Sequence, residues 1–294
     1  MSRTALVVSL MREVHTRFDK PALIDDTWAR TFVPNAEREA ILRSRNVELA
    51  DIPSVEASLT TALRASPAYP SVILRTRWAE DALQAAVARG VCQYVIIGAG
   101  MDSLALRQPE FARRIRIIEV DHPATQGFKR ERLRAADVRI PPTLTFVPAD
   151  LAATSLDSAL ENSSYRKDEP AFFAWLGVTM YLTREANFAT LRSIARCSAE
   201  GSELAFTYVD ELELDPARQS TASKEVQQRA GSFGEAWISG FTPAELPAEV
   251  RAAGLAVRED LDGEQISRRY YGKNANALRP LLTNHYVRAQ VVAE

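Results

Sequence analysis

The sequence predicts an α/β protein in which an open, mostly parallel sheet carries helices on both faces. Three observations predict this fold. Short apolar runs alternate with stretches of helical periodicity from residue 75 to residue 210, a rhythm typical of parallel sheets. Two glycines follow the first apolar run and an acidic residue follows the second, at the positions where such sheets bind ligands. Two later apolar segments bring the expected strands to seven.

The chain begins with a region for which we expect helices. Residues 1–74 have no convincing period-two pattern and are interrupted by prolines, so they are predicted to form a helical N-terminal cap. The first residues contain a short apolar run without a long hydrophobic region or a small-residue cleavage site, which indicates a helix and not a signal peptide. Apolar residues at helical spacing predict a further helix after Arg75, and Gly90 is placed to end it.

Residues 75–294 are predicted to form the sheet domain. Residues 94–97 are continuously apolar, as expected for a strand buried on both faces. Residues 211–240 are polar and break the rhythm, so we expect an insertion over the ligand site there. The other expected strands are residues 115–121, 144–147, 171–176, 204–209, 255–257 and 285–291, and a helix is expected at 184–197.

Composition narrows the possible partners. Hydrophobic residues make up 46% of the 294 residues, enough for a large core, and 36 basic against 38 acidic residues give a net charge of −2. This balance argues against a nucleic-acid or anionic-membrane partner, and the charged segment 129–134 is interpreted as a solvated helix face. Cys92 and Cys197 lack metal-binding spacing. We therefore expect a soluble cytoplasmic protein without a metal, acting on a small molecule.

The loop after the first strand suits a ligand that lies close to the backbone. Gly98 and Gly100 allow a tight turn without a Cβ in the way. Ser103 occupies the place of the third glycine of a dinucleotide fingerprint, which argues against an NAD-dependent oxidoreductase. By itself the loop is also compatible with a purely structural turn.

The next two strand ends carry acidic residues. Asp121 lies 21 residues after Gly100, where a carboxylate can accept hydrogen bonds from a ribose diol, and Glu119 is the reserve candidate because it lies on the same side of the strand. Asp150 could accept a bond from an adenine amine beside the apolar edge of Leu151, although a helix N-cap is the alternative. Together the three loops predict a nucleoside site without pyrophosphate recognition.

These segments resemble the leucine carboxyl methyltransferase-like group of class I methyltransferases, which includes polyketide O-methyltransferases. The likeness extends from about residue 15 to about residue 270. It implies a Rossmann-like class I methyltransferase fold, S-adenosylmethionine as cofactor and a role in secondary metabolism. The segments that carry it are Arg75-Thr76-Arg77, residues 98–103, Glu119-Val120-Asp121-His122-Pro123, Asp150-Leu151, Met180-Tyr181-Leu182-Thr183 and residues 231–243.

The resemblance also implies roles for individual residues. A planar guanidinium can donate two parallel hydrogen bonds to a carboxylate, which suits Arg75 to the methionine end of the cofactor. Many relatives have a glutamate near the cofactor's amino group where this chain has Leu176, so another acceptor must serve there, backbone carbonyls being one option. The implied cofactor residues are Arg75, Gly98 and Gly100 at the methionine and ribose, Asp121 at the ribose, and Asp150 with Leu151 at the adenine.

The methyl acceptor is less well defined by the sequence. A carboxylate acceptor needs no base, whereas a hydroxyl benefits from one. His15, Tyr181 and His285 are weak candidates for such a base, and Tyr181 and Trp237 are candidates to line the acceptor pocket or to pack in the core. We expect methyl transfer to a carboxyl or hydroxyl oxygen, with a catalytically silent cofactor-binding protein as the alternative. The sequence does not indicate an oligomeric state.

Overall fold

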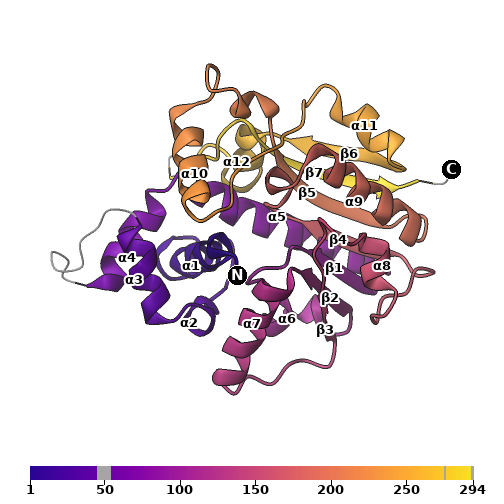
Figure 1. Cartoon of the computed structure of the whole chain (residues 1–294), viewed down its shortest axis with the longest axis horizontal. Coiled ribbons are helices and arrows are strands. Elements are labelled where there is room, and N and C mark those ends of the chain that lie inside the picture. The colour runs from indigo at the N-terminus through magenta and orange to yellow at the C-terminus, as the bar shows by residue number, and fades with distance from the viewer. Residues whose placement is uncertain (45–53, 275, 293–294) are drawn as a thin grey trace.

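The computed structural model describes residues 1–44, 54–274 and 276–292, and it confirms the α/β architecture. A seven-stranded sheet carries helices on both faces (Figure 1). All the predicted strands are present. Their bounds are β1 Gln93–Ile97, β2 Arg116–Asp121, β3 Leu144–Pro148, β4 Ala171–Trp175, β5 Glu203–Val209, β6 Leu255–Leu261 and β7 Asn284–Val291.

The strand order β3-β2-β1-β4-β5-β7-β6 explains where a ligand can bind. Pairing is parallel from β3 to β5, and β7 is antiparallel to both β5 and β6. The order reverses between β1 and β4, so their carboxyl ends flank a crevice. Strand β6 continues to Leu261, beyond the predicted 255–257. An irregularity between Val257 and Glu259 interrupts its period-two pattern, which explains why the prediction ended too early.

Helices cover the sheet on both faces and extend beyond one end of it (Figure 1). Helix α5 ends where Gly90 adopts φ +103°, as the sequence predicts. The α-helices are α1 Arg3–Phe18, α2 Ala29–Phe32, α3 Asn35–Arg43, α4 Val55–Arg64, α5 Tyr69–Ala88, α6 Leu104–Arg107, α7 Pro123–Ala135, α8 Leu156–Leu160, α9 Arg184–Cys197, α10 Thr221–Ser232, α11 Leu246–Ala252 and α12 Gly263–Tyr271. The 3-10 turns are η2 Glu110–Ala112, η3 Thr179–Tyr181 and η4 Glu211–Leu214.

Each face of the sheet has its own hydrophobic core, because alternate side chains of a strand point to opposite faces. Phe173 and Trp175 of β4 are fully buried against α8, α9 and α11. Phe172 and Ala174 are fully buried on the other face, against α5, α6 and α12. The sheet is therefore held between two apolar layers.

A third core is formed by helices α1, α2, α3 and α4 together with the start of α5. Tyr69 and Ile73 of α5 belong to this core, whereas Trp78 and Leu83 of the same helix pack on the sheet. The domain boundary expected after residue 74 thus falls inside α5, a helix shared by both parts. Residues 45–53 of the predicted cap lie outside the described residues.

Candidate functional site

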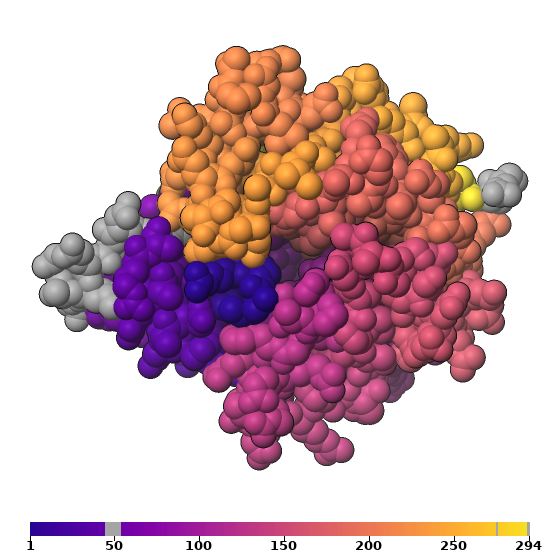
Figure 2. Space-filling view, in the orientation of Figure 1, coloured from indigo at the N-terminus to yellow at the C-terminus, as the bar shows by residue number. Residues whose placement is uncertain are grey.

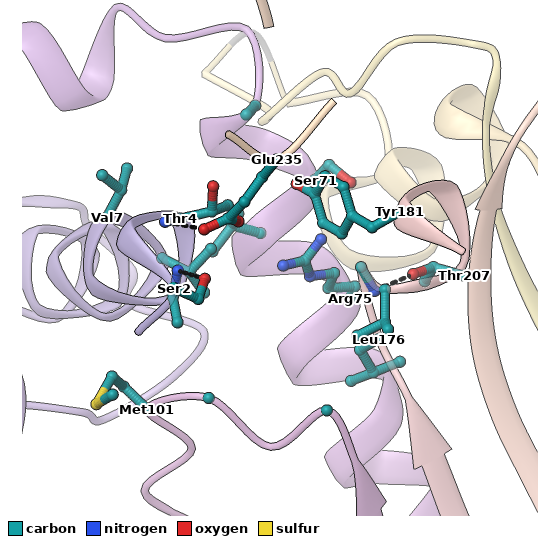
Figure 3. A pocket seen from close by; sticks show the side chains of 18 of the residues that line it. Ser2, Thr4, Val7, Ser71, Arg75, Met101, Leu176, Tyr181, Thr207 and Glu235 are labelled. Carbon is teal, nitrogen blue, oxygen red and sulfur yellow. Dashed lines mark hydrogen bonds between the residues drawn. The ribbon is translucent and has the colours of Figure 1, made fainter. Parts of the chain in front are cut away.

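A cavity of about 710 Å³ lies at the carboxyl ends of β1, β2 and β4 (Figure 3). The loop after β1 forms its floor, one face of α5 forms a wall, and α1 covers it. Predicted site residues from distant parts of the sequence meet here. Those that line the cavity are Arg75, Gly98, Gly100, Asp121, Tyr181 and Trp237, together with Leu176.

Asp121 is fixed by backbone groups of the loop beside it. Its Oδ2 accepts a hydrogen bond from the Gly100 N–H, and its Oδ1 accepts one from the His122 N–H at 2.6 Å. Burial raises the pKa of Asp121 above its usual value, and these two donors oppose that shift. Gly100 adopts φ +53°, and a Cβ there would lie 3.0 Å from the Cβ of Ala5. The glycine therefore lets the loop turn directly beneath α1.

Glu119, the reserve candidate for the ribose, does not line the cavity. It is buried beneath the loop and forms an ion pair with Lys129 at 2.6 Å. Burial raises the pKa of Glu119 to about 7, although Lys129 opposes the shift. The interpretation of residues 129–134 as a solvated face is wrong for Lys129, because its Nζ reaches inward to Glu119 and to the Asp102 carbonyl at 2.7 Å.

Arg75 brings a cation into the cavity without an anion to neutralise it. Figure 3 shows its side chain pointing into the cavity, with Leu176 on one side and Tyr181 on the other. Within the described ranges the guanidinium forms no ion pair, and burial lowers the pKa of Arg75. Gly177 allows this position, because a Cβ there would lie 2.2 Å from Nη1 of Arg75. An anionic group of a ligand is the natural partner for this guanidinium.

Ser103 has a structural role in a buried polar network that joins α1 to the glycine loop. Its hydroxyl donates to Asp26 Oδ2 at 2.6 Å and accepts from Arg107 Nε at 2.9 Å. Arg12 of α1 binds the same Asp26 oxygen at 2.7 Å, and Arg107 pairs with Glu80 of α5. Burial raises the pKa of Glu80 while Arg107 opposes it. The network fixes the loop relative to two helices.

The predicted adenine residues lie outside the lining of the cavity. Asp150 follows β3 and is exposed, and its Oδ1 accepts a hydrogen bond from the Ala152 N–H at 3.0 Å. Leu151 is partly buried against the core on that side of the sheet. Asp121 pairs with Pro148, the last residue of the neighbouring strand β3. Asp150 therefore lies two residues beyond the end of that strand.

The two histidine candidates for a base lie away from the cavity, each with its Nδ1 next to a carboxylate. His15 is fully buried, with Nδ1 2.8 Å from Asp19, and its Nε2 accepts the Leu23 N–H at 2.8 Å. His285 lies 2.9 Å from Asp260 and stacks on a tyrosine ring. Neither lines the cavity. Both side chains therefore have partners in the described structure that lie outside the cavity.

The first turn of α1 closes the cavity by contacting two other segments. The Ser2 N–H donates to Thr125 Oγ1 of α7 at 3.0 Å, and the Thr4 N–H donates to Glu235 Oε1 at 3.4 Å. Figure 2 shows the start of the chain lying between α7 and the segment after α10. Segment 211–240 is held at its ends by a bridge between Asp210 and Phe241.

Tyr181 and Trp237 face the cavity from η3 and from segment 211–240. Burial raises the pKa of Tyr181, and the nearby Glu235 carboxylate raises it further. Glu235 and Thr4 also line the cavity, and neither was predicted from the sequence. Glu235 could have been suspected as the acidic residue inside the familiar segment 231–243, whereas nothing in the sequence brings Thr4 next to it.

No group of three or more histidine, cysteine, aspartate or glutamate side chains is arranged to hold a metal ion in the described part of the chain. Among its helices, none combines the length and the apolar character that crossing a bilayer requires.

The chain was compared with known proteins. The leucine carboxyl methyltransferase family matches residues 5–195. A Bacillus subtilis protein named "putative S-adenosyl-L-methionine-dependent methyltransferase YktD" is 31% identical over 300 residues, covering 98% of this chain and 97% of the relative.

Two solved structures share the fold. A DUF574 family protein from Streptomyces avermitilis aligns with a TM-score of 0.58 at 14% identity, covering 86% of this chain and 96% of that one. A "putative methyltransferase" from Thermobifida fusca aligns with a TM-score of 0.54 at 17% identity, covering 87% and 93%. At these identities the two structures bear on the fold alone.

Proposed function

Because this chain belongs to the leucine carboxyl methyltransferase family of S-adenosylmethionine-dependent methyltransferases, we propose that it methylates an oxygen atom of a small-molecule acceptor. Family membership establishes the methyl donor and argues against hydride transfer with NAD. The bound cofactor supplies an electrophilic methyl group on a sulfonium. The protein then has to align the acceptor with that methyl group and exclude water from the cavity.

The observation that supports methyl transfer in this cavity is the unpaired guanidinium of Arg75 in the same cavity as the Asp121 carboxylate, and the family name supports an oxygen acceptor. Arg75 is suited to the carboxylate of the methionine moiety through two parallel hydrogen bonds. Asp121 is suited to the ribose diol, and Gly98 and Gly100 leave room for the cofactor against the loop. The residues present therefore fit the cofactor.

The proposal also includes partners for the adenine and for the ammonium of the cofactor. Asp150 and Leu151 are suited to the adenine only if this base extends past Asp121 toward β3, because both lie outside the lining of the cavity. Leu176 lines the cavity but cannot accept a bond from the cofactor's ammonium. Backbone carbonyls of the surrounding loops are our candidates for that acceptor.

Two measurements test the proposal. Calorimetry should detect binding of S-adenosylhomocysteine. With S-adenosylmethionine that carries a tritiated methyl group, a broad panel of hydroxyl and carboxyl compounds should contain some that become labelled on an oxygen atom. Label found only on nitrogen or sulfur would contradict the oxygen acceptor. Tight binding without turnover on any compound would favour the silent cofactor-binding alternative.

A further inference from the structure

Two buried cations hold the carbonyl groups at the end of the glycine loop. Residues 98–102 all line the cavity. Nη2 of Arg12 on α1 donates to the Met101 carbonyl at 2.5 Å, and Nζ of Lys129 on α7 donates to the Asp102 carbonyl at 2.7 Å. Lys129 itself does not line the cavity, so its bond reaches the loop from the side away from the ligand.

The Lys129 ammonium is fully buried and has partners on three different segments. Besides the loop carbonyl, it pairs with Oε2 of Glu119 on β2 at 2.6 Å and lies 5.6 Å from the centre of the Phe32 ring at the end of α2. An ammonium has three N–H donors and is attracted to the face of an aromatic ring. These contacts leave the ammonium little freedom, so it can fix the position of the carbonyl that it binds.

Stability alone does not explain an ion pair at this place. Replacing both partners of a buried pair by apolar side chains of similar volume is often neutral or stabilising. An apolar side chain cannot donate to the Asp102 carbonyl, and within the described residues this carbonyl accepts a hydrogen bond only from Lys129. What the ion pair provides beyond an apolar pair is therefore a fixed end of the loop.

This fixed end is directly connected to the groups that face the cofactor in the function proposed above. The Asp102 N–H closes the turn by donating to the Ala99 carbonyl at 2.9 Å. Inside the turn, the Gly100 N–H donates to Oδ2 of Asp121. Holding the Asp102 carbonyl thus restricts the whole turn, and a restricted loop loses less conformational entropy when a ligand binds.

Resting on the function proposed above, we propose that Lys129 is a positioning residue for the cofactor. By holding the Asp102 carbonyl, Lys129 keeps the glycine loop in the shape that leaves room for the methionine and ribose moieties. Glu119 serves as its counter-ion and does not touch the cofactor, because it is buried beneath the loop and outside the lining of the cavity.

A double substitution separates this role from stability. Lys129→Met with Glu119→Leu removes the bond to the carbonyl without leaving a buried charge, so the midpoint of thermal unfolding should stay close to that of the wild type. Calorimetry should show S-adenosylhomocysteine binding weakened roughly tenfold, the size expected for the loss of one bond from a charged donor. Glu131→Leu with Arg134→Met, the same substitutions at an exposed pair of α7, should leave the affinity unchanged.

Hydrogen exchange gives a second readout, which a role in stability alone would not change. In the double variant, the backbone amides of residues 98–103 should exchange faster although global stability is unchanged.

A single substitution tests the proposal if the double variant does not fold. Lys129→Met is then measured at pH 5.5, where the same tenfold loss is expected. Burial raises the pKa of Glu119 to about 7 against the opposing effect of Lys129, so without that cation the carboxyl is neutral at pH 5.5. The other charged groups that face it, Asp102 on the loop and Asp121 at the end of β2, raise its pKa further.

The proposal is overturned if the folded variant binds S-adenosylhomocysteine as tightly as the wild type, or if exchange of the loop amides is unchanged. Lys129 would then contribute to stability alone. It is also overturned if the control pair on α7 weakens binding to the same extent. Failure of the wild type to bind S-adenosylhomocysteine would instead contradict the function proposed above.

Discussion

The two ends of the cavity are built in different ways. At the glycine-loop end, polar groups already have partners: Asp121 accepts two backbone N–H bonds, and Ser103 lies in a buried network. At the other end, formed by Glu235, Tyr181 and Trp237 and called the Glu235 end, the Thr4 hydroxyl and the Trp237 N–H are buried without a hydrogen bond shorter than 3.5 Å in the described structure, and both lie near the Tyr181 hydroxyl. Apart from Arg75, the polar groups at the loop end have partners without a ligand, whereas the Glu235 end has polar groups that a ligand could bind more closely.

This difference indicates where binding energy comes from at each end. A preorganised end loses little conformational entropy when a ligand arrives, which favours affinity. An end with unsatisfied donors discriminates between ligands, because a compound that lacks the matching oxygen leaves those donors unpaired. We therefore expect substitutions at the loop end to change stability and cofactor affinity, and substitutions at the Glu235 end to change acceptor choice.

The largest effect is expected beneath the glycine loop, at the buried pair of Lys129 and Glu119. Lys129→Met leaves the Glu119 carboxylate buried without its cation, which should cost about 3–5 kcal/mol of unfolding free energy at pH 8.5. Because burial raises the pKa of Glu119 to about 7, well above its unfolded value, the folded state binds the proton more tightly. Stability from this group is therefore present at low pH and lost as pH rises through about 7.

The pH dependence gives the control for this substitution. Urea unfolding of Lys129→Met should show a much smaller loss at pH 5.5, where Glu119 is protonated, than at pH 8.5. Arg134→Met, which removes an exposed pair on the same helix, should leave stability unchanged at both values. An equal loss at both pH values would mean that packing, and not the charge of Glu119, explains the effect.

The second-largest effect is expected at Arg75, the unpaired cation at the loop end of the cavity. Arg75→Met should weaken S-adenosylhomocysteine binding roughly 100-fold, because two charge-assisted hydrogen bonds are lost. The midpoint of thermal unfolding should not fall, since the guanidinium has no anion to lose in the described structure. Arg77→Met, on the same helix, removes a half-exposed pair with Asp81 and should leave affinity unchanged. Undiminished affinity in Arg75→Met would remove Arg75 from the cofactor site.

The sequence predicts the loop end of the cavity better than the other end, for a physical reason. Gly100 follows β1 and Asp121 ends the neighbouring strand β2, so their offset in sequence sets their proximity in space. Thr4 and Glu235 are 231 residues apart and meet only because α1 packs over the glycine loop. A contact of that kind depends on tertiary packing, which periodicity and spacing do not encode.

The parallel strands β1 to β5 were predictable because strands buried on both faces of a sheet are largely apolar. The burial of Lys129 was not predictable, since it begins a run of charged residues on its helix, most of them exposed, and nothing local marks the one that turns inward. Arg75 was assigned only through the family resemblance, and its helical spacing from Val72 and Ala79 places it on the lining face only once α5 is in position.

A smaller effect is expected at the contact between the loop and α1. Gly100→Ala should cost about 1–2 kcal/mol of unfolding free energy, because it adds a Cβ at positive φ and close to Ala5. Adding Ala5→Gly should recover only the part due to the contact. Gly127→Ala, on α7 with nothing near the new Cβ, should instead stabilise the protein slightly. Chemical denaturation of all four proteins separates backbone strain from crowding.

The smallest changes in stability are expected from substitutions of two threonines, one at each end of the cavity. Thr125 Oγ1 accepts the Ser2 N–H at 3.0 Å, so Thr125→Val should cost about 1 kcal/mol by leaving that donor unpaired. The Thr4 hydroxyl lies near the Tyr181 hydroxyl but has no hydrogen bond shorter than 3.5 Å in the described structure, so Thr4→Val, which keeps the shape, should be neutral or slightly stabilising by thermal unfolding. It should also leave S-adenosylhomocysteine affinity unchanged. Equal destabilisation by the two substitutions would show that the Thr4 hydroxyl is already satisfied, and the contrast between the two ends would not hold.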